Sequence, residues 1–301
     1  MNIVDRIQEL KKQKNAVILV HNYQLPEIQD IADHTGDSLG LSMQAAKTDA
    51  DMIVFCGVYF MAETAKILSP QKTVVIPDKT AGCPMAQMIT VEQLRALKKE
   101  HPKAKVLCYV NSSAEIKAES DVCCTSANAL TIAEKAFTED DEIIFIPDKF
   151  LALYTASQVK RKFIFWKGYC PTHMKILPEY INEIKKHDPE AKVVVHPECV
   201  QETIKIADKV CSTGGMSKYV ENSNARSFII GTENGMVYRL QKDNPDKKFY
   251  TVSDLATCPN MKKTTLDKVL NSLENNEYEI TIDNETIVKA RKSIDAMFRF
   301  V

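Results

Sequence analysis

The sequence predicts an α/β protein made of three similar three-layer αβα domains, with small parallel sheets arranged around a pseudo-threefold axis. Two observations predict this fold. Short apolar runs alternate with helical patterns along all 301 residues, as in folds that bury parallel strands between helices. Several sequence landmarks also recur every 87–88 residues. That period is longer than those of solenoid repeats, so it indicates domain triplication.

Nine apolar runs are the predicted strands, three in each third of the chain. Most are rich in β-branched residues and lack polar alternation, which is typical of parallel strands buried on both faces. The runs cover residues 17–20, 52–55, 73–76, 105–109, 142–146, 162–166, 192–196, 226–230 and 248–252. The stretches between them favour helices, for example residues 90–98 and 177–186.

The period also predicts the domain boundaries. The first αβα unit covers residues 1–83, the second 84–170 and the third 171–258. Residues 259–301 fall outside the period, and we expect two helices around a short strand that pack back on the first unit. Open α/β sheets build their sites at the carboxyl ends of their strands. Three such edges around one axis would surround one cavity.

Composition excludes several classes of partner. Hydrophobic residues make up 45% of the chain, charged residues 26%, and the net charge is −1, which is the ordinary globular range. There is no run of like charges, so we expect neither nucleic acid nor an anionic membrane as a partner. The first residues lack the apolar core of a signal peptide, and no apolar run approaches the ~18 residues that span a bilayer. The sequence therefore predicts a cytoplasmic protein.

Three of the nine cysteines are followed directly by proline. These are Cys83, Cys170 and Cys258, separated by 87 and 88 residues. Each ends a segment beside Gly, Thr or Pro, so we expect each on a loop, and the proline biases the cysteine backbone toward extended geometry. Cys56 and Cys108 instead lie inside apolar runs and are predicted core residues. Triplication alone could leave three equivalent structural cysteines, because long-range cysteine spacing is weak evidence for a metal.

The sharper hypothesis is a metal centre with three thiolates. Thiolates suit zinc or an iron–sulfur cluster. Three ligands leave one position open, as catalytic metal sites do. His173, three residues after Cys170, could complete a Cys₃His zinc site or contact the substrate instead. The residues alone leave zinc and iron–sulfur both open.

Three hydroxyl residues recur with the same period. Ser38, Ser126 and Thr213 each follow a strand, and each is predicted to open a helix. A hydroxyl and free N–H groups at a helix start form an anion site, although each residue alone could be a simple N-cap. Together they predict a ligand with several carboxylates or phosphates.

Acidic and aromatic side chains near predicted strand ends are candidates for proton transfer. Glu198, beside His196, is a candidate general base, and the alternative is a solvated loop carboxylate. Tyr23 and Tyr109 are either proton donors or packing residues. One sequence does not separate these alternatives.

The ordered motifs resemble the quinolinate synthase family over the whole chain. They are H-N-Y-Q-L-P-E-I-Q-D-I-A-D (21–33), G-D-S-L (36–39), M-A-E-T-A-K-I-L (61–68), P-D-K-T-A-G-C (77–83), Y-V-N-S (109–112), C-T-S-A-N (124–128), W-K-G-Y-C-P-T-H (166–173), H-P-E-C (196–199), S-T-G-G-M (212–216), G-T-E-N-G-M (231–236) and C-P-N-M-K (258–262). The resemblance implies three α/β domains around a pseudo-threefold axis. It also implies one [4Fe-4S] cluster held by Cys83, Cys170 and Cys258, with the fourth iron left for substrate.

The family reaction condenses iminoaspartate with dihydroxyacetone phosphate and releases phosphate and water, giving quinolinate for NAD biosynthesis. The resemblance carries substrate contacts onto His21, Ser38, Tyr109, Val110, Asn111, Ser126, His173, His196, Pro197, Glu198 and Thr213. The catalytic hypothesis is that the open iron acts as a Lewis acid and Glu198 as general base, while Tyr23, Tyr109 and His21 move protons. A transient contact with the enzyme that makes the imine is a further expectation.

Two features depart from the family or have no family role. The resemblance leads us to expect Asn and Gly near positions 150 and 152, where the chain has Phe150 and Ala152, so the local loop geometry is in question. No role is carried over to Cys123 and Cys124. The competing classes are a zinc-dependent hydrolase or lyase with a three-cysteine site, a non-enzymatic iron–sulfur sensor and a plain small-molecule binding protein.

Overall fold

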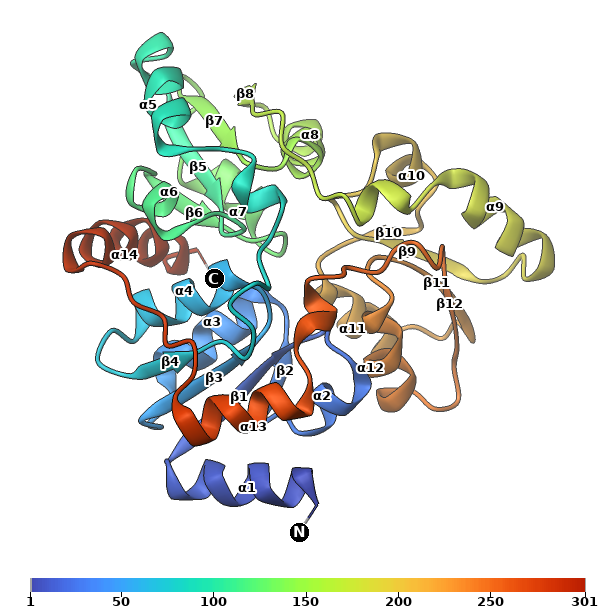
Figure 1. Cartoon of the computed structure of the whole chain (residues 1–301). Helices are drawn as coiled ribbons and strands as arrows, with labels where there is room; N and C mark the ends of the chain where they lie inside the picture. The colour runs from blue at the N-terminus through green and yellow to red at the C-terminus, as the bar shows by residue number, and fades with distance from the viewer. Residues whose placement is uncertain (1, 301) are drawn as a thin grey trace.

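The computed structural model describes residues 2–300 and contains three α/β units built on one plan (Figure 1). Each unit is a sheet of four parallel strands with helices against it. The strand orders are β2-β1-β3-β4, β6-β5-β7-β8 and β10-β9-β11-β12. The same order appears three times, so the structure confirms the predicted fold class.

The first unit begins with an amphipathic helix and carries the first sheet. Its elements are α1 (Ile3–Gln13), β1 (Ala16–His21), α2 (Pro26–Asp30), β2 (His34–Gly36), α3 (Ser38–Lys47), β3 (Met52–Cys56), α4 (Tyr59–Leu68) and β4 (Thr73–Val75). All five residues of β3 are buried, as expected for a parallel strand covered on both faces.

The second unit follows the first Cys-Pro pair. Its elements are η1 (Met85–Gln87), α5 (Val91–Glu100), β5 (Lys105–Tyr109), α6 (Ala114–Ala118), β6 (Val122–Cys124), α7 (Ala129–Lys135), β7 (Glu142–Ile146), α8 (Lys149–Gln158) and β8 (Lys162–Phe165). Thr90 and Gln93 form a capping box at the start of α5, which satisfies two N–H groups that the first helical turn leaves free.

The third unit follows the second Cys-Pro pair. Its elements are η2 (His173–Lys175), α9 (Pro178–His187), β9 (Lys192–Val195), α10 (Gln201–Lys205), β10 (Lys209–Val210), α11 (Thr213–Glu221), β11 (Ser227–Gly231), α12 (Gly235–Asp243) and β12 (Lys248–Thr251). Pro178 is at the first turn of α9, a position where its missing N–H costs nothing.

The tail contains η3 (Met261–Lys263), α13 (Leu266–Asn275) and α14 (Asn284–Phe298). Between the two longer helices, Glu279 forms an antiparallel bridge with Val75 of β4. Helix α13 lies against α1 and β3 of the first unit, whereas α14 lies mainly against α6 and β6 of the second. The tail therefore contacts two units, and the predicted boundaries between units stay a prediction.

Each of the nine predicted runs contains a strand, but the structure adds a short fourth strand to each sheet. These are β2, β6 and β10, which have three, three and two residues. All three are edge strands. Runs this short have no periodicity of their own, so sequence reasoning did not include them among the apolar runs.

The two departures from the family pattern lie on α8. Asp148 caps this helix by accepting the Leu151 N–H at 2.6 Å. Phe150 and Ala152 both follow inside the regular helix, where alanine is a strong helix former. The segment is thus an ordinary helix start, and these residues do not distort it. None of the helices within residues 2–300 combines the length and apolar character needed to cross a membrane.

Candidate active site and metal centre

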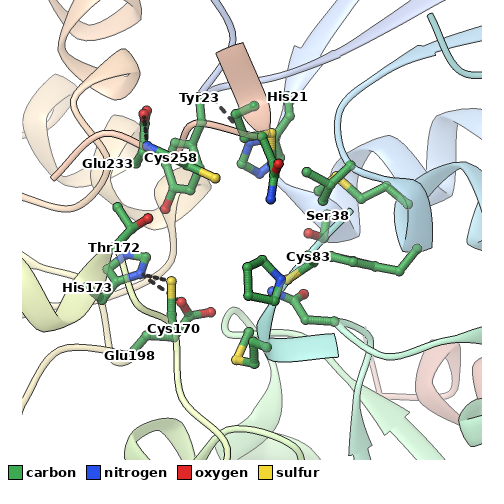
Figure 2. A pocket seen from close by; sticks show the side chains of 18 of the residues that line it. His21, Tyr23, Ser38, Cys83, Cys170, Thr172, His173, Glu198, Glu233 and Cys258 are labelled. Carbon is green, nitrogen blue, oxygen red and sulfur yellow. Dashed lines mark hydrogen bonds and ion pairs between the residues drawn. The ribbon is translucent and has the colours of Figure 1, made fainter. Parts of the chain in front are cut away.

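A cavity lies where the three units meet (Figure 2). Its empty space, with the solvent-filled mouth included, is about 950 Å³. The structure brings these predicted residues to its wall: His21, Tyr23, Ser38, Cys83, Tyr109, Asn111, Ser126, Cys170, His173, His196, Glu198, Thr213 and Cys258. Val110 and Pro197 are buried but are not part of the lining; the Val110 N–H is bonded to the Cys124 carbonyl at 2.9 Å.

The three Cys-Pro pairs share one local geometry. Each precedes a short 3₁₀ helix, η1, η2 or η3. For each cysteine, the backbone N–H of the residue three positions later, which is Ala86, His173 or Met261, acts to lower the pKa of the thiol. Proline suits the intervening position, because its fixed φ starts a helical turn and its missing N–H is not needed there. The cysteines lie on three sides of the cavity (Figure 2).

Burial keeps these thiols protonated in the absence of a metal. It raises the pKa of Cys83 to about 12, and it also raises the pKa values of Cys170 and Cys258. The Glu198 carboxylate adds to the effect at Cys83 and Cys170. Because thiolate is the metal-binding form, a metal bound here would release protons from this centre.

His173 connects a thiol to a carboxylate. Its Nδ1 lies 3.0 Å from the Cys170 sulfur and 2.8 Å from Glu198 Oε2. Ligand atoms of these three residues all lie within 4.8 Å of one another. His173 thus lies where it could bind a metal beside Cys170 or contact a bound substrate.

Glu198 is a buried, hydrogen-bonded carboxylate. It is 3% exposed, and its Oε1 accepts the Tyr109 hydroxyl at 2.6 Å. Burial alone would raise its pKa, but electrostatic interaction with the His173 and His196 rings and the hydrogen bonds from His173 and Tyr109 hold it well below its usual value. The side chain is therefore an ionised carboxylate, and the alternative of a solvated loop residue is wrong.

A second chain of hydrogen bonds links the first and third units. The Tyr23 hydroxyl lies 2.5 Å from Thr232 Oγ1, which lies 3.0 Å from His173 Nε2. Burial raises the pKa of Tyr23 well above its usual value, and the nearby Glu198 charge adds to this effect. Tyr23 is thus a protonated donor connected through Thr232 to the His173 ring.

His21 and His196 occupy equivalent places in two units. The Nδ1 of His21 accepts the Tyr23 N–H at 3.2 Å, and that of His196 accepts the Glu198 N–H at 3.3 Å. This leaves Nε2 as the atom that carries the proton, and His196 Nε2 lies 3.0 Å from Ser126 Oγ. Burial lowers the pKa of each histidine to about 3. Both rings are therefore neutral donors toward the cavity.

Two of the three predicted hydroxyl sites lie at helix starts. Ser38 is the first residue of α3 and Thr213 the first of α11. Ser126 does not open a helix, because Asn128 is the cap of α7 and its side chain instead accepts the Thr125 N–H at 2.7 Å. That prediction is wrong for Ser126, although its hydroxyl still reaches the cavity.

Three residues near the cavity had no predicted role. Asp37 caps α3 and accepts the Ser212 hydroxyl at 3.2 Å, so a carboxylate already lies between two helix starts. Thr232 carries the contact between Tyr23 and His173, and Glu233 is a fully buried carboxylate. The available signal was a polar residue directly after a buried strand, as in G231-T-E-N-G.

Cys123 and Cys124 lie on β6, away from the cavity wall. Both are fully buried, and the Cys123 sulfur lies 3.3 Å from Ser293 Oγ on α14. Their place is in the core beneath the tail helix.

The fold and site define a class: a three-unit α/β protein with three cysteines and a buried hydrogen-bond network around one cavity. The family model for quinolinate synthetase A protein matches residues 5–299. The chain is 53% identical over 299 residues to a quinolinate synthase of Dehalococcoides mccartyi (strain CBDB1), covering 99% of this chain and 98% of that protein. It is 52% identical over 296 residues to quinolinate synthase 1 of Methanosarcina acetivorans, covering 98% and 97%. The chain belongs to the quinolinate synthetase A family.

Proposed function

We propose that this protein is a quinolinate synthase that condenses iminoaspartate with dihydroxyacetone phosphate, releasing phosphate and water. Quinolinate formed in this way feeds de novo NAD biosynthesis, and the proposal includes a cytoplasmic location. Family membership supports the reaction. The observation that carries it is the meeting of Cys83, Cys170 and Cys258 in one cavity beside Glu198 and Tyr109. Iminoaspartate is a reactive imine, so a transient contact with the enzyme that supplies it is part of the proposal.

The donor set fits one [4Fe-4S] cluster. Cys83, Cys170 and Cys258 offer three soft sulfur ligands, one from each unit. Backbone N–H groups beside all three sulfurs act to lower the pKa of the thiols and so favour the thiolate form. When bound, the cluster would supply a Lewis-acidic iron without a protein ligand. The transferase class and the iron–sulfur chemistry belong to this proposal.

The protein's own residues would move the protons. Ionised Glu198 is placed to accept a proton, and Tyr109, bonded to it at 2.6 Å, would return one. Tyr23 would donate to substrate and recover its proton through Thr232 and His173. The neutral rings of His21 and His196 would donate from Nε2 to substrate oxygen atoms.

Anionic groups of the substrates would be bound by neutral donors. The Ser38, Ser126 and Thr213 hydroxyls reach the cavity from three units. The Asn111 side-chain oxygen is buried without a hydrogen-bond partner, so a substrate donor would satisfy it. The Asp37 carboxylate would repel another anion placed between α3 and α11. The carboxylate and phosphate groups of the substrates would therefore lie nearer to the hydroxyl groups than to Asp37.

A zinc-dependent hydrolase or lyase is the second candidate. Its support is the close group of Cys170, His173 and Glu198, because sulfur, imidazole and carboxylate are all zinc ligands. In that case one ion would be bound at one edge of the cavity, and Cys83 and Cys258 would be dispensable for metal binding.

The test is a quinolinate assay on protein purified without oxygen and supplied with both substrates. We expect quinolinate and phosphate in equal amounts, and no product when either substrate is left out. Protein that contains an iron–sulfur cluster but forms no quinolinate would contradict the proposed reaction. Activity that depends on zinc would favour the hydrolase or lyase.

A further inference from the structure

An ion pair with one fully buried partner lies beside Cys258 and has no part in the proposed chemistry. The Glu233 side chain is fully buried, and Lys262 Nζ lies 3.0 Å from its Oε1. Such a pair is tolerated inside a protein only when other hydrogen bonds satisfy the remaining donors and acceptors. The contacts of this pair therefore indicate what it holds in place.

Each of those contacts leads to a backbone group. Glu233 Oε1 accepts the Cys258 N–H at 2.9 Å, and Oε2 accepts the Gly235 N–H at 2.7 Å. Lys262 Nζ donates to the Tyr23 carbonyl oxygen. The pair thus joins a cysteine of the metal centre, the start of α12 and the tyrosine of the proton chain. The last of these belongs to a different unit.

The site is closed around these groups. A Cβ atom on Gly235 would lie 2.8 Å from Lys262 Nζ, 2.8 Å from the Tyr23 carbonyl oxygen and 2.9 Å from Glu233 Oε2. These distances are shorter than carbon atoms tolerate, so the close approach requires glycine. The Glu233–Lys262 ion pair is therefore in close contact with the backbone of both Tyr23 and Gly235.

The three units differ at this position. The equivalent position in each unit is two residues beyond the end of β3, β7 or β11, and it is occupied by Val58, Asp148 or Glu233. Asp148 is also fully buried, but its Oδ1 accepts the Leu151 N–H and its Oδ2 has no hydrogen-bond partner. The Val58 side chain has no acceptor, and within residues 2–300 no hydrogen bond is found from the N–H of Cys83 or of Cys170. Among the described residues, a carboxylate that accepts the N–H of one of these cysteines is therefore a feature of the third unit rather than a requirement of the fold.

We propose that Glu233 is a positioning residue that fixes the backbone of Cys258 as a cluster ligand, and that Lys262 ties Glu233 to Tyr23. The inference rests on the proposed function, since it requires a cluster on the three cysteines. Loss of the Glu233 acceptor frees the Cys258 loop and leaves the loops of Cys83 and Cys170 as they are. Release of Cys258 from the cluster is then faster, while the other two cysteines are unaffected.

Two double variants with equal charge test this. Glu233→Gln/Lys262→Met keeps an acceptor oxygen at position 233, and Glu233→Met/Lys262→Met removes it. Cluster-loaded proteins are treated with an iron chelator and iodoacetamide, and labelling of each cysteine is followed by peptide mass spectrometry. We expect labelling of Cys258 in the Met/Met variant to rise about tenfold, as loss of one charge-assisted hydrogen bond implies. Labelling in the Gln/Met variant stays near that of the wild type.

The outcomes separate positioning from general damage. Equal acceleration at all three cysteines in the Met/Met variant, or none at Cys258, overturns the inference. Val58→Ala is the matched control in the first unit, and a rise at Cys83 equal to that at Cys258 would mean that packing rather than hydrogen bonding holds these loops. A wild-type protein that binds no cluster overturns the proposed function and the inference with it. If the wild type binds a cluster, the labelling of Cys258 tests the inference separately from the proposed function.

Discussion

The junction between the first and second units differs in kind from the junctions made by the third unit. One apolar cluster runs through the first two sheets and α14, and includes Phe60, Phe145 and Met297. The third unit has two apolar clusters of its own. It meets the other units through polar contacts such as Tyr23 with Thr232 and Tyr109 with Glu198.

The difference teaches which part of the molecule is scaffold. The stability of an apolar junction depends on buried area and close packing and does not require a ligand. In the polar junctions of the third unit, Tyr23, Tyr109 and Glu198 also line the cavity. The same contacts therefore hold the third unit in place and build the site, so changes to the site also act on the attachment of that unit.

The largest effect is expected at the contact between the second and third units. Glu198→Gln keeps an acceptor for the Tyr109 hydroxyl but removes the negative charge. We expect turnover to fall by roughly 10²-fold or more, the size of a general-base contribution, while iron and sulfide content stay at the wild-type level. The fall in turnover is measured from initial rates of quinolinate formation by samples with the same cluster content. An unchanged rate would remove Glu198 from the proton-transfer role.

A substitution in the apolar junction should instead cost stability. Ile294 is fully buried on α14 within the shared cluster, and Ile294→Ala should lower the free energy of unfolding by about 2–5 kcal/mol. Val288→Ala, at an exposed position of the same helix, is the control and should change little. Denaturant unfolding of the metal-free protein compares them. Equal effects of the two variants would mean that α14 is not part of the core.

Acid should weaken the fold through the buried histidines of the first and third units. The folded-state pKa values of His21 and His196 are about 3, below the ~6.5 of an unfolded chain. The unfolded chain therefore binds more protons between these values. The stability contributed by the neutral rings is complete above about pH 6.5 and is lost as pH falls toward 3.

His21→Asn tests this pH dependence, because asparagine can still accept the Tyr23 N–H but does not titrate. Thermal unfolding of the metal-free protein between pH 7 and pH 4.5 should show a shallower acid dependence in the variant. Parallel curves for the variant and the wild type would contradict this account, because they would mean that His21 has the same pKa in the folded and the unfolded chain.

The smallest effect is expected at a single polar contact of the third unit. Asn22 Nδ2 donates to Thr213 Oγ1 at 2.9 Å inside the protein, and Asn22→Ala should cost about 1 kcal/mol. Hydrogen exchange should quicken in α11 and leave β5 and β7 unchanged. Arg226→Ala, which removes an exposed ion pair within the third unit, should leave exchange in α11 as it was. Faster exchange in all three sheets would contradict a separate attachment of the third unit.

Much of the fold follows from the sequence because buried parallel strands leave a clear record. Runs such as M-I-V-F-C at 52–56 are apolar throughout, and the repeated unit shows in the period of the Cys-Pro pairs. The edge strand β10 has two residues and leaves no such record. The contacts of α14 with the second unit depend on the path of the tail, which no local pattern encodes.

The candidate site was predictable where a residue's type and neighbours indicate chemistry. Cys83, Cys170 and Cys258 have a shared motif, and Glu198 follows a strand beside a histidine. Thr232 was not predictable, because its role arises from a contact with Tyr23, 209 residues away. Glu233 carries no motif of its own, and only the folded chain shows that it accepts the Cys258 N–H.

The most direct test is the metal and sulfide content of protein purified without oxygen, together with its visible spectrum. A single [4Fe-4S] cluster on the three cysteines predicts about four iron and four sulfide per chain. Cys83→Ala should lose both, and Cys56→Ala, a buried cysteine outside the cavity wall, should keep them. Stoichiometric zinc without sulfide, or a full cluster in Cys83→Ala, would contradict a three-cysteine iron–sulfur site.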